Sequence, residues 1–287
     1  MVDYIFGNYL VECGKITKPQ LFEVIKKQDE VRAKIGFIAV AEGMMTSAQA
    51  DEVNRLQATM DKRFGNIAVE KGYLTEEQVL WLLDKQGNAW QTFIQTLVEE
   101  QLILLEELEW LLEGFKRENE YDDEQLEALK SDEPERIIPL LLPEGGCKYQ
   151  ELIGTMVRTM IRLIDRHVYL GRAAMVDELP ADGASQALEG NGGFIDCLAE
   201  RDGGLRRACS VFGQEEFTGF SMDMLDAAGE LLNCVNGLYA SARSREGQFL
   251  ELMPPQYRPR RDVREDSVCR IPVFVGGKGL YFAIGER

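Results

Sequence analysis

The stretch KIGFIAVAEGMMTSAQADEVNRLQ (Lys34–Gln57) has two further copies at a spacing of 29 residues, IFGNYLVECGKITKPQLFEVIKKQ (Ile5–Gln28) before it and RFGNIAVEKGYLTEEQVLWLLDKQ (Arg63–Gln86) after it. Each copy has the same special residues at the same places. These are a first glycine (Gly7, Gly36, Gly65), a second glycine (Gly14, Gly43, Gly72), a threonine (Thr17, Thr46, Thr75) and a final glutamine (Gln28, Gln57, Gln86). A fixed period of this length is typical of helical repeats, which bury their apolar faces by packing on one another.

Each copy is predicted to form a short helix, a turn and a longer helix. The second glycine stands where a helix end needs a left-handed residue, and the threonine that follows begins a Thr-x-x-Gln capping box for the next helix. In the longer helix, apolar residues such as Leu21, Val24 and Ile25 recur at helical spacing. Residues 1–118 are therefore predicted to be an all-α module of tandem helical repeats.

A fourth copy, TFIQTLVEEQLILLEELEWLLEGF (Thr92–Phe115), keeps the register and the apolar stripe but loses the special residues. Their places are taken by Ile94, Gln101, Leu104 and Phe115. Terminal repeats are often atypical because they cap the stack, so we expect a structural role for this copy.

The segment 119–147 is polar and mostly acidic at its start and then contains Pro139, Pro143 and a Gly-Gly pair. Such a change of composition indicates a boundary. We predict an acidic linker that is solvated and holds a short helix near Glu124 to Leu129.

Residues 148–287 are predicted to be an α+β domain with two long helices on an antiparallel sheet. Amphipathic helices are expected from Lys148 to Arg166 and from Met222 to Ser244. HVYLGRAAMVDEL, GFIDCLAER and LRRACSVFG carry mixed apolar and β-branched residues between turn residues, and are predicted to be strands. A final hairpin is expected to turn at Gly276 to Gly279, with Pro272 suited to an edge strand.

Composition excludes several classes of function. The formal net charge of −17 repels nucleic acid polymers and anionic membrane surfaces. His167 is the only histidine, which excludes Ser-His-Asp, Cys-His and multi-histidine metal chemistry. The six cysteines form no CxxC pair, so no metal site is predicted and the thiols are expected to be reduced. With no membrane span, we expect a cytoplasmic protein, for which a homodimer through the sheet edge or the repeats is compatible with the sequence.

The outward face of the predicted helix at 222–244 carries polar residues at helical spacing. Asp226, Glu230, Asn233 and Gly237 are separated by steps of four, three and four. Asparagine and glycine are poor helix formers, and a glycine inside a helix costs about 1 kcal/mol relative to alanine. Something other than helix stability is therefore expected to have selected them.

The repeats resemble the MshEN motif found in the N-terminal domains of type II secretion and type IV pilus ATPases. That motif has a basic residue, an apolar residue and then GxxLxxxGx6LxxxLxxQ, and the second and third copies fit it best. The resemblance implies a cyclic di-GMP ligand held by Lys34, Gly36, Gly43, Gln57, Arg63, Gly65, Gly72 and Gln86. Four positions depart from the motif, because Ala39, Ala68, Ala50 and Asn54 replace leucines.

Glycine backbone allows close approach to a phosphate, and an arginine can stack on guanine. The same glycines and glutamines are also compatible with a second interpretation, in which they serve only helix packing and capping.

The segment SMDMLDAAGELLNCVNGLYASA (Ser221–Ala242) resembles the active helix of the CheX/CheC family of chemotaxis phosphatases. That helix carries an acidic or serine residue and then E-x-x-N, with a proline some twenty residues further on. Asp226, Glu230 and Asn233 match this pattern, and Pro254 and Pro255 match the downstream proline. Only one such helix is present, because the helix at 148–166 has no E-x-x-N, and this is more similar to single-site CheX than to two-site CheC.

This resemblance implies hydrolysis of the aspartyl phosphate on a response-regulator receiver domain. Asn233 would orient the attacking water, Glu230 would pair with a lysine of the receiver, and Asp226 would be peripheral. The partner would bring the phosphate and Mg²⁺, so positioning is nearly all that the helix must supply.

Together these patterns suggest a bacterial signalling protein in which a helical sensor for cyclic di-GMP is joined to a CheX-like phosphatase. The alternative is a non-enzymatic adaptor, in which the repeats bind the nucleotide, the CheX-like domain is degenerate and binds a protein partner, and nothing is hydrolysed.

Overall fold

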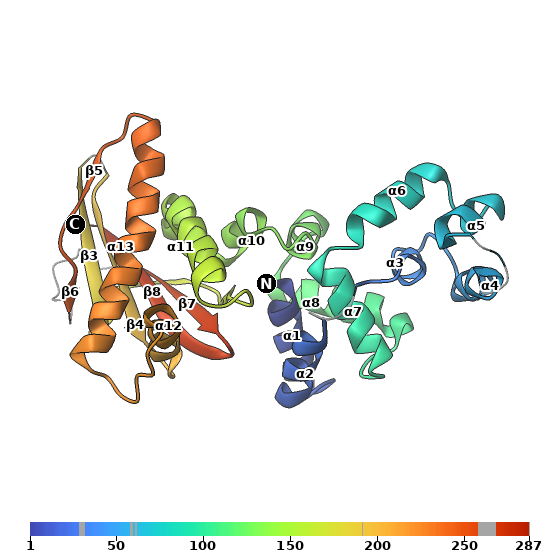
Figure 1. The fold of residues 1–287 in the computed structure, drawn as a ribbon, viewed down its shortest axis with the longest axis horizontal. Helices are drawn as coiled ribbons and strands as arrows, with labels where there is room; N and C mark the ends of the chain where they lie inside the picture. The colour runs from blue at the N-terminus through green and yellow to red at the C-terminus, as the bar shows by residue number, and fades with distance from the viewer. Residues whose placement is uncertain (29–31, 58–59, 61, 191, 258–267, 287) are drawn as a thin grey trace. The chain divides into compact units, whose positions relative to one another are not determined.

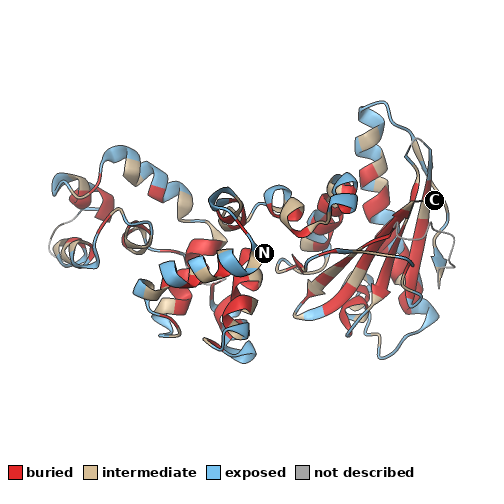
Figure 2. Ribbon diagram, turned by 180° about the vertical axis from the view of Figure 1, so that it is seen from behind, coloured by how far each residue is buried: buried red, intermediate tan, exposed pale blue. Residues whose placement is uncertain are grey.

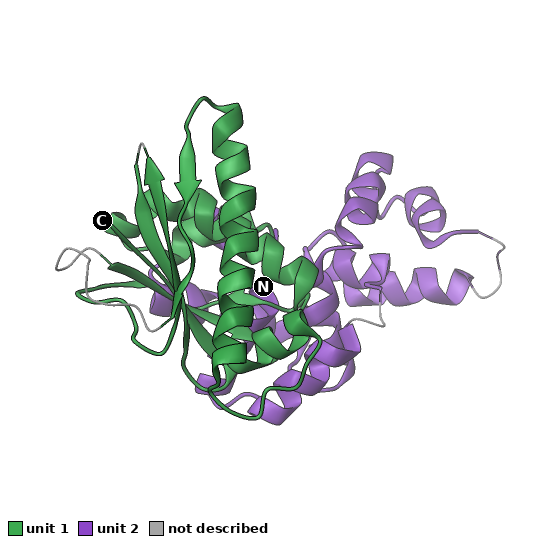
Figure 3. Cartoon of the chain, turned by 60° about the vertical axis from the view of Figure 1, so that its left-hand side comes forward, with its two compact units in different colours: residues 1, 133–287 green, residues 2–132 purple. Residues whose placement is uncertain are grey.

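The computed structural model describes residues 1–28, 32–57, 60, 62–190, 192–257 and 268–286. Residues 2–132 form one compact unit, and residues 133–287 make up nearly all of the other (Figure 3). The unit of residues 2–132 is helical, and the other, the α+β unit, combines helices with an antiparallel sheet.

The four sequence copies form helix pairs in the helical unit (Figure 1). In the second and third copies a short helix and a tight turn precede a longer helix, as predicted, whereas the two helices of the first copy are equally long. The helices are α1 (Val2–Glu12), α2 (Lys18–Gln28), α3 (Ile35–Ala41), α4 (Ser47–Gln57), α5 (Phe64–Glu70), α6 (Glu76–Lys85), α7 (Ala89–Glu99) and α8 (Leu108–Asn119), with the 3₁₀ turn η1 (Leu105–Glu107) before α8.

The turn between the two helices of a copy is left-handed in all four copies. Gly14, Gly43 and Gly72 have φ of 70°, 68° and 71°, and Gln101 takes the same conformation with φ of 57°. The fourth copy therefore keeps the backbone turn without its glycine. The predicted capping boxes also form; in the third copy the Thr75 N–H donates to Gln78 Oε1 (2.8 Å) and the Gln78 N–H donates to Thr75 Oγ1 (3.2 Å).

The copies pack in nested pairs. The second and third copies share one apolar core, to which Ile38, Val53, Ile67 and Leu82 contribute fully buried side chains. The first and fourth copies pack through aromatic rings, with Phe6 in edge contact with Trp90 and Phe115. The atypical fourth copy thus supplies the hydrophobic partner of the first, and nearly all of α7 is buried.

The segment predicted to be a solvated linker is folded instead. It contains α9 (Asp123–Lys130), which confirms the short helix predicted near Glu124 to Leu129, and also α10 (Pro134–Leu141) and the 3₁₀ helix η2 (Glu144–Tyr149). The prediction was wrong here because the acidic residues lie on outer faces while apolar residues at helical spacing are buried, namely Leu126, Leu129, Ile137, Ile138 and Leu141. Pro134 begins α10, where proline needs no N–H partner, and the division between the units falls at residues 132 and 133.

Among the described residues of the α+β unit, the strands form one antiparallel sheet in the order β1-β7-β8-β4-β3-β5, with β2 also on β7 and β6 also on β3. The strands are β1 (Tyr169–Leu170), β2 (Ala174–Val176), β3 (Gly183–Gly190), β4 (Phe194–Glu200), β5 (Leu250–Leu252), β6 (Gln256–Tyr257), β7 (Val268–Val275) and β8 (Lys278–Glu286). The helices are α11 (Gln150–Leu163), α12 (Gly204–Gly213) and α13 (Met222–Arg245).

The predicted long helices are confirmed as α11 and α13, and the predicted final hairpin is β7–β8, turning at Gly276 and Gly277. LRRACSVFG, predicted to be a strand, is helix α12, because its buried residues Leu205, Ala208 and Cys209 follow a helical period. Strand β3 was not predicted, since GASQALEG has no β-branched or aromatic residue. Strand β7 is not an edge strand; Pro272 lies in the gap between its partners β1 and β2, where the Gly171 N–H donates to the Pro272 carbonyl.

Helix α13 packs on the sheet over β3 and runs beside α11 and α12. Figure 2 shows its buried side facing the sheet and its other side exposed. In the sheet below, β3 and β4 pair with Gln186 directly opposite Asp196. The fold thus places two polar side chains of the sheet beneath the helix that carries the E-x-x-N pattern.

We predict that Gly72→Ala lowers the free energy of unfolding by about 1 kcal/mol, because the left-handed conformation at φ of 71° strains any residue with a Cβ. Gly87→Ala is the matched control, since neither position has a heavy atom near an added Cβ and Gly87 is not left-handed. Urea unfolding of the full chain measures both. Equal effects of the two substitutions would contradict the proposed strain.

Candidate functional site

Helix α13 begins at a side-chain cap and buries one stripe. The Met224 N–H donates to Ser221 Oγ (3.2 Å), which satisfies one of the free donors of the first turn. The buried stripe runs through Met224, Ala228, Leu231, Leu232 and Val235 to Tyr239. Leu238 and Ala242 continue the steps of four and three from Met224 but are exposed, because a straight helix drifts away from a strict alternation of four and three.

The opposite face carries the candidate residues outward. Asp226, Glu230 and Asn233 are all exposed, and a Cβ added at Gly237 would meet no heavy atom within 4 Å. The carboxylate of Asp226 accepts a hydrogen bond from the Tyr257 hydroxyl, and this bond raises the pKa of Tyr257 to about 12. Glu230 and Asn233 lie one turn apart on a surface open to another molecule.

The carboxamide of Asn233 is held from below by the sheet. Gln186 Nε2 donates to Asn233 Oδ1 (3.0 Å) and to the carbonyl of Met253 (2.9 Å). Met253 directly precedes Pro254 and Pro255 in the sequence, and a Cβ added at Gly229 would lie 3.0 Å from Pro255 Cβ. The structure therefore brings together the E-x-x-N helix and the downstream prolines that the sequence pattern singles out.

Beneath these residues lies a buried polar cluster that sequence reasoning missed. Asn236 Nδ2 donates to Gln186 Oε1 (2.9 Å) and to Asp196 Oδ1 (3.0 Å), and at most 1% of each of the three residues is exposed. Burial raises the pKa of the Asp196 carboxyl to about 8. One signal was available: Asn236 is a polar, poor helix former in the buried stripe of an otherwise apolar helix face.

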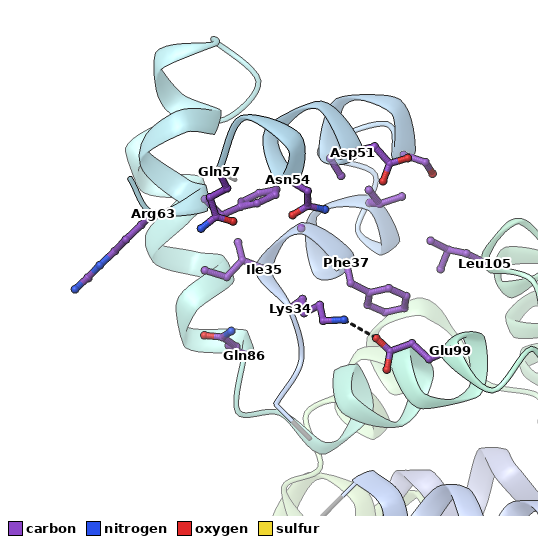
Figure 4. A pocket seen from close by; sticks show the side chains of 15 residues that line it. Lys34, Ile35, Phe37, Asp51, Asn54, Gln57, Arg63, Gln86, Glu99 and Leu105 are labelled. Carbon is purple, nitrogen blue, oxygen red and sulfur yellow. Dashed lines mark hydrogen bonds and ion pairs between the residues drawn. The ribbon is translucent and has the colours of Figure 1, made fainter. Parts of the chain in front are cut away.

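A second candidate site lies in the helical unit. A cavity of about 600 Å³ is lined by five of the residues predicted to hold a ligand, namely Lys34, Gly36, Gln57, Arg63 and Gln86 (Figure 4). Phe37, Asp51, Asn54 and Glu99 also line it.

Two of the lining residues, Lys34 and Gln86, already bind other groups of the protein. Lys34 Nζ forms an ion pair with Glu99 (2.8 Å), and Gln86 Nε2 donates to the Ala33 carbonyl (2.7 Å). In Figure 4 the Arg63 side chain extends away from the other labelled side chains.

The other three predicted ligand residues lie elsewhere. Gly43 and Gly72 form left-handed turns after α3 and α5, and they do not line this cavity. Gly65 lines a groove in the third copy that corresponds, at the 29-residue spacing, to the wall of the cavity in the second copy. Leu80 and Leu83 occupy the places of Asp51 and Asn54 there, so the two equivalent surfaces differ in polarity.

The part of the chain that the structure describes contains no cluster of three His, Cys, Asp or Glu side chains able to hold a metal ion. All six cysteines are free thiols. None of the described helices combines the length and the apolar character needed to cross a membrane.

No family model matches the sequence, and the search of curated proteins found no similar one. Among solved structures, CheX/CheC-like chemotaxis proteins are similar over about half of this chain. A CheC-like superfamily protein from Shewanella sp. PV-4 is 14% identical, with a TM-score of 0.40 over 47% of this chain and 93% of that one. CheX from Vibrio vulnificus is 12% identical, with a TM-score of 0.38 over 47% and 95%. A CheX–CheY–BeF₃–Mg²⁺ complex from Borrelia burgdorferi matches at 15% identity, with a TM-score of 0.36 over 47% and 94%.

Because the pKa of Asp196 is about 8 in the folded protein and 3.8 ordinarily, the folded state holds a proton there that the unfolded state releases. The resulting stabilisation is complete below pH 3.8 and is lost as the pH rises to about 8. We predict that Asp196→Asn, which cannot ionise, removes this loss. The measurement is the free energy of urea unfolding at about pH 5 and about pH 8 for both proteins. An equal drop in wild type and variant would contradict a neutral Asp196.

Proposed function

We propose that the α+β unit is a CheX-type phosphatase that hydrolyses the aspartyl phosphate of a response-regulator receiver domain. The observation that carries the proposal is the placement of Glu230 and Asn233 one turn apart on the open face of α13, with the Asn233 carboxamide held by Gln186. Asn233 has an oriented amide, and Glu230 has a carboxylate able to pair with a cation of a docking protein.

The proposed mechanism relies on positioning. An amide oxygen has two lone pairs, so Asn233 Oδ1 can accept a hydrogen bond from a water molecule while it keeps the one from Gln186. That water would be aligned for in-line attack on the phosphorus of the docked receiver. Mg²⁺ bound by the receiver would neutralise the charge that develops on the phosphoryl oxygens.

Asp226 has a peripheral role in this proposal. Its carboxylate already accepts the Tyr257 hydroxyl, whereas Glu230 lies on the same exposed face one turn nearer to Asn233. Glu230 would pair with a lysine of the receiver and so contribute to docking rather than to the attack.

The test follows phosphate loss from a phosphorylated CheY-type receiver domain mixed with the purified full chain. Asn233→Ala is expected to slow hydrolysis on the order of 100-fold, the usual effect of losing a positioning group. Cys234→Ala, at the neighbouring exposed residue of the same helix, is the control and should keep the wild-type rate. Glu230→Ala should mainly raise KM.

The alternative function is a non-enzymatic adaptor, and the same assay separates the two. Equal phosphate loss in wild type, Asn233→Ala and the receiver alone would exclude catalysis for that partner. Binding of a receiver loaded with BeF₃⁻ and Mg²⁺, if it persists in that case and is weakened by Glu230→Ala, would establish docking without hydrolysis.

A specific observation favours a second function for the helical unit, which we propose binds cyclic di-GMP. Five of the residues implied by the MshEN resemblance line one cavity, although they come from three separate segments of the chain. Lys34 would exchange its ion pair with Glu99 for a phosphate, and Gly36 would allow the ligand close to the backbone. Asp51 and Glu99 oppose an anion, so the ligand must be held largely by amides and by the two basic side chains.

Calorimetric titration of cyclic di-GMP into the full chain tests this function. The double variant Lys34→Ala and Arg63→Ala is expected to weaken binding at least about tenfold, because charge-assisted hydrogen bonds to phosphate are lost. Lys18→Ala, an exposed residue of the first copy that does not line the cavity, is the control. Absence of heat at high micromolar nucleotide would leave the repeats as a protein-binding array.

A further inference from the structure

The amide group of Gln186 forms hydrogen bonds with both of its polar atoms between the sheet and α13. Its Nε2 donates to Asn233 Oδ1 and to the Met253 carbonyl, at 3.0 Å and 2.9 Å, while its Oε1 accepts from Asn236 Nδ2 at 2.9 Å. Only 1% of the residue is exposed. Both amide hydrogens and the amide oxygen therefore have partners, and water has no access to replace any of them.

The orientation of this amide is determined from both sides. Asn236 Nδ2 is a donor, so it must face Gln186 Oε1, and the Met253 carbonyl is an acceptor, so it must face Nε2. Asn236 is itself anchored by donating to Asp196 Oδ1 at 3.0 Å. Reversing the Gln186 amide would place two donors together at Asn236 and two acceptors together at Met253, and burial makes both arrangements costly.

We infer that Gln186 is a positioning residue for Asn233, since the fixed Nε2 draws the Asn233 oxygen toward the sheet and determines which edge of the carboxamide faces a docked partner. This inference rests on the proposed phosphatase function. The same Nε2 also holds the carbonyl before Pro254, and so sets the helix and the proline segment at one mutual distance.

The Asn233 side chain otherwise projects into solvent, where an unrestrained amide rotates freely about χ2. Within the described residues, its hydrogen bond to Gln186 is the contact that restrains it. Catalysis by positioning requires the reacting groups to be oriented before the partner arrives, so the loss of Gln186 should reduce the rate of hydrolysis rather than docking.

The first test reads the amide directly by NMR of the full chain labelled with ¹⁵N-asparagine. The Asn233 Nδ2 signal is identified by its disappearance in Asn233→Ala. In Gln186→Met, which has similar length and no donor, that signal should move toward the position of a free asparagine. Gln256→Met is the matched control, because Gln256 is exposed on the strand beside β3 and its substitution should leave the Asn233 signal in place.

The second test uses the receiver-domain assay. Gln186→Met should lower kcat about tenfold with KM unchanged, as expected for loss of one orienting hydrogen bond. If Gln186→Met fails to fold, Gln186→Ala replaces it, because it also donates nothing to Asn233 and leaves Asn236 its bond to Asp196.

The two tests distinguish failure of the positioning inference from failure of the proposed phosphatase function. An Asn233 signal that is the same in the folded Gln186 variant as in wild type overturns the inference, whatever the assay gives. A signal that moves, in a protein with no hydrolytic activity, supports the positioning role and overturns the proposed phosphatase instead.

Discussion

Buried hydrogen bonds between α13 and the sheet beneath it are the interaction on which the α+β unit depends, because a polar side chain placed there without any partner is costly. Gln186 and Asp196 stand opposite each other on β3 and β4, directly below α13. Asn236 binds both, and Gln186 extends the connection to Asn233 and to the Met253 carbonyl. A purely apolar interface would allow the helix to rotate slightly on the sheet, whereas these directional bonds favour one register.

The register of α13 on the sheet also determines which residues lie on its exposed face. The buried stripe and the outer face of a helix are geometrically linked, so fixing Asn236 inward fixes Glu230 and Asn233 outward. The neutral form of Asp196 suits this arrangement, because a buried carboxylate without a cation would be strongly destabilising. The exposed position of Glu230 and Asn233 thus depends on residues buried beneath the helix.

In the helical unit the dominant constraint is the left-handed turn between the helices of each copy. Glycine was the sequence signal for it, yet Gln101 adopts the same turn in the fourth copy. The burial of α7 against the first copy compensates for that strained residue. The backbone geometry of the repeat is therefore kept in a copy that has lost the special residues. The cavity is lined mainly by the second and third copies, with Glu99 and Leu105 from the fourth.

Much of this could be predicted from local patterns. The 29-residue period, the capping boxes, the two long helices, the final hairpin and the outward position of Asp226, Glu230 and Asn233 all follow from residues close together in sequence. The predictions of secondary structure were wrong for short segments whose composition was compatible with more than one structure. Segment 204–213 is helical although it has the composition of a strand, and the acidic segment after residue 119 folds because its few apolar residues find a core.

The sequence by itself determined the repeat, the helix faces and the candidate residues, because helical periodicity and turn chemistry act over a few residues. Only the tertiary structure decided the pairing of first with fourth and second with third copies, the gathering of Lys34, Gln57 and Gln86 around one cavity, and the contact of Gln186 with Asn233. Those partners are separated by tens of residues along the chain, and their meeting depends on which cores and sheet registers bury the most apolar surface while giving most buried polar groups a partner.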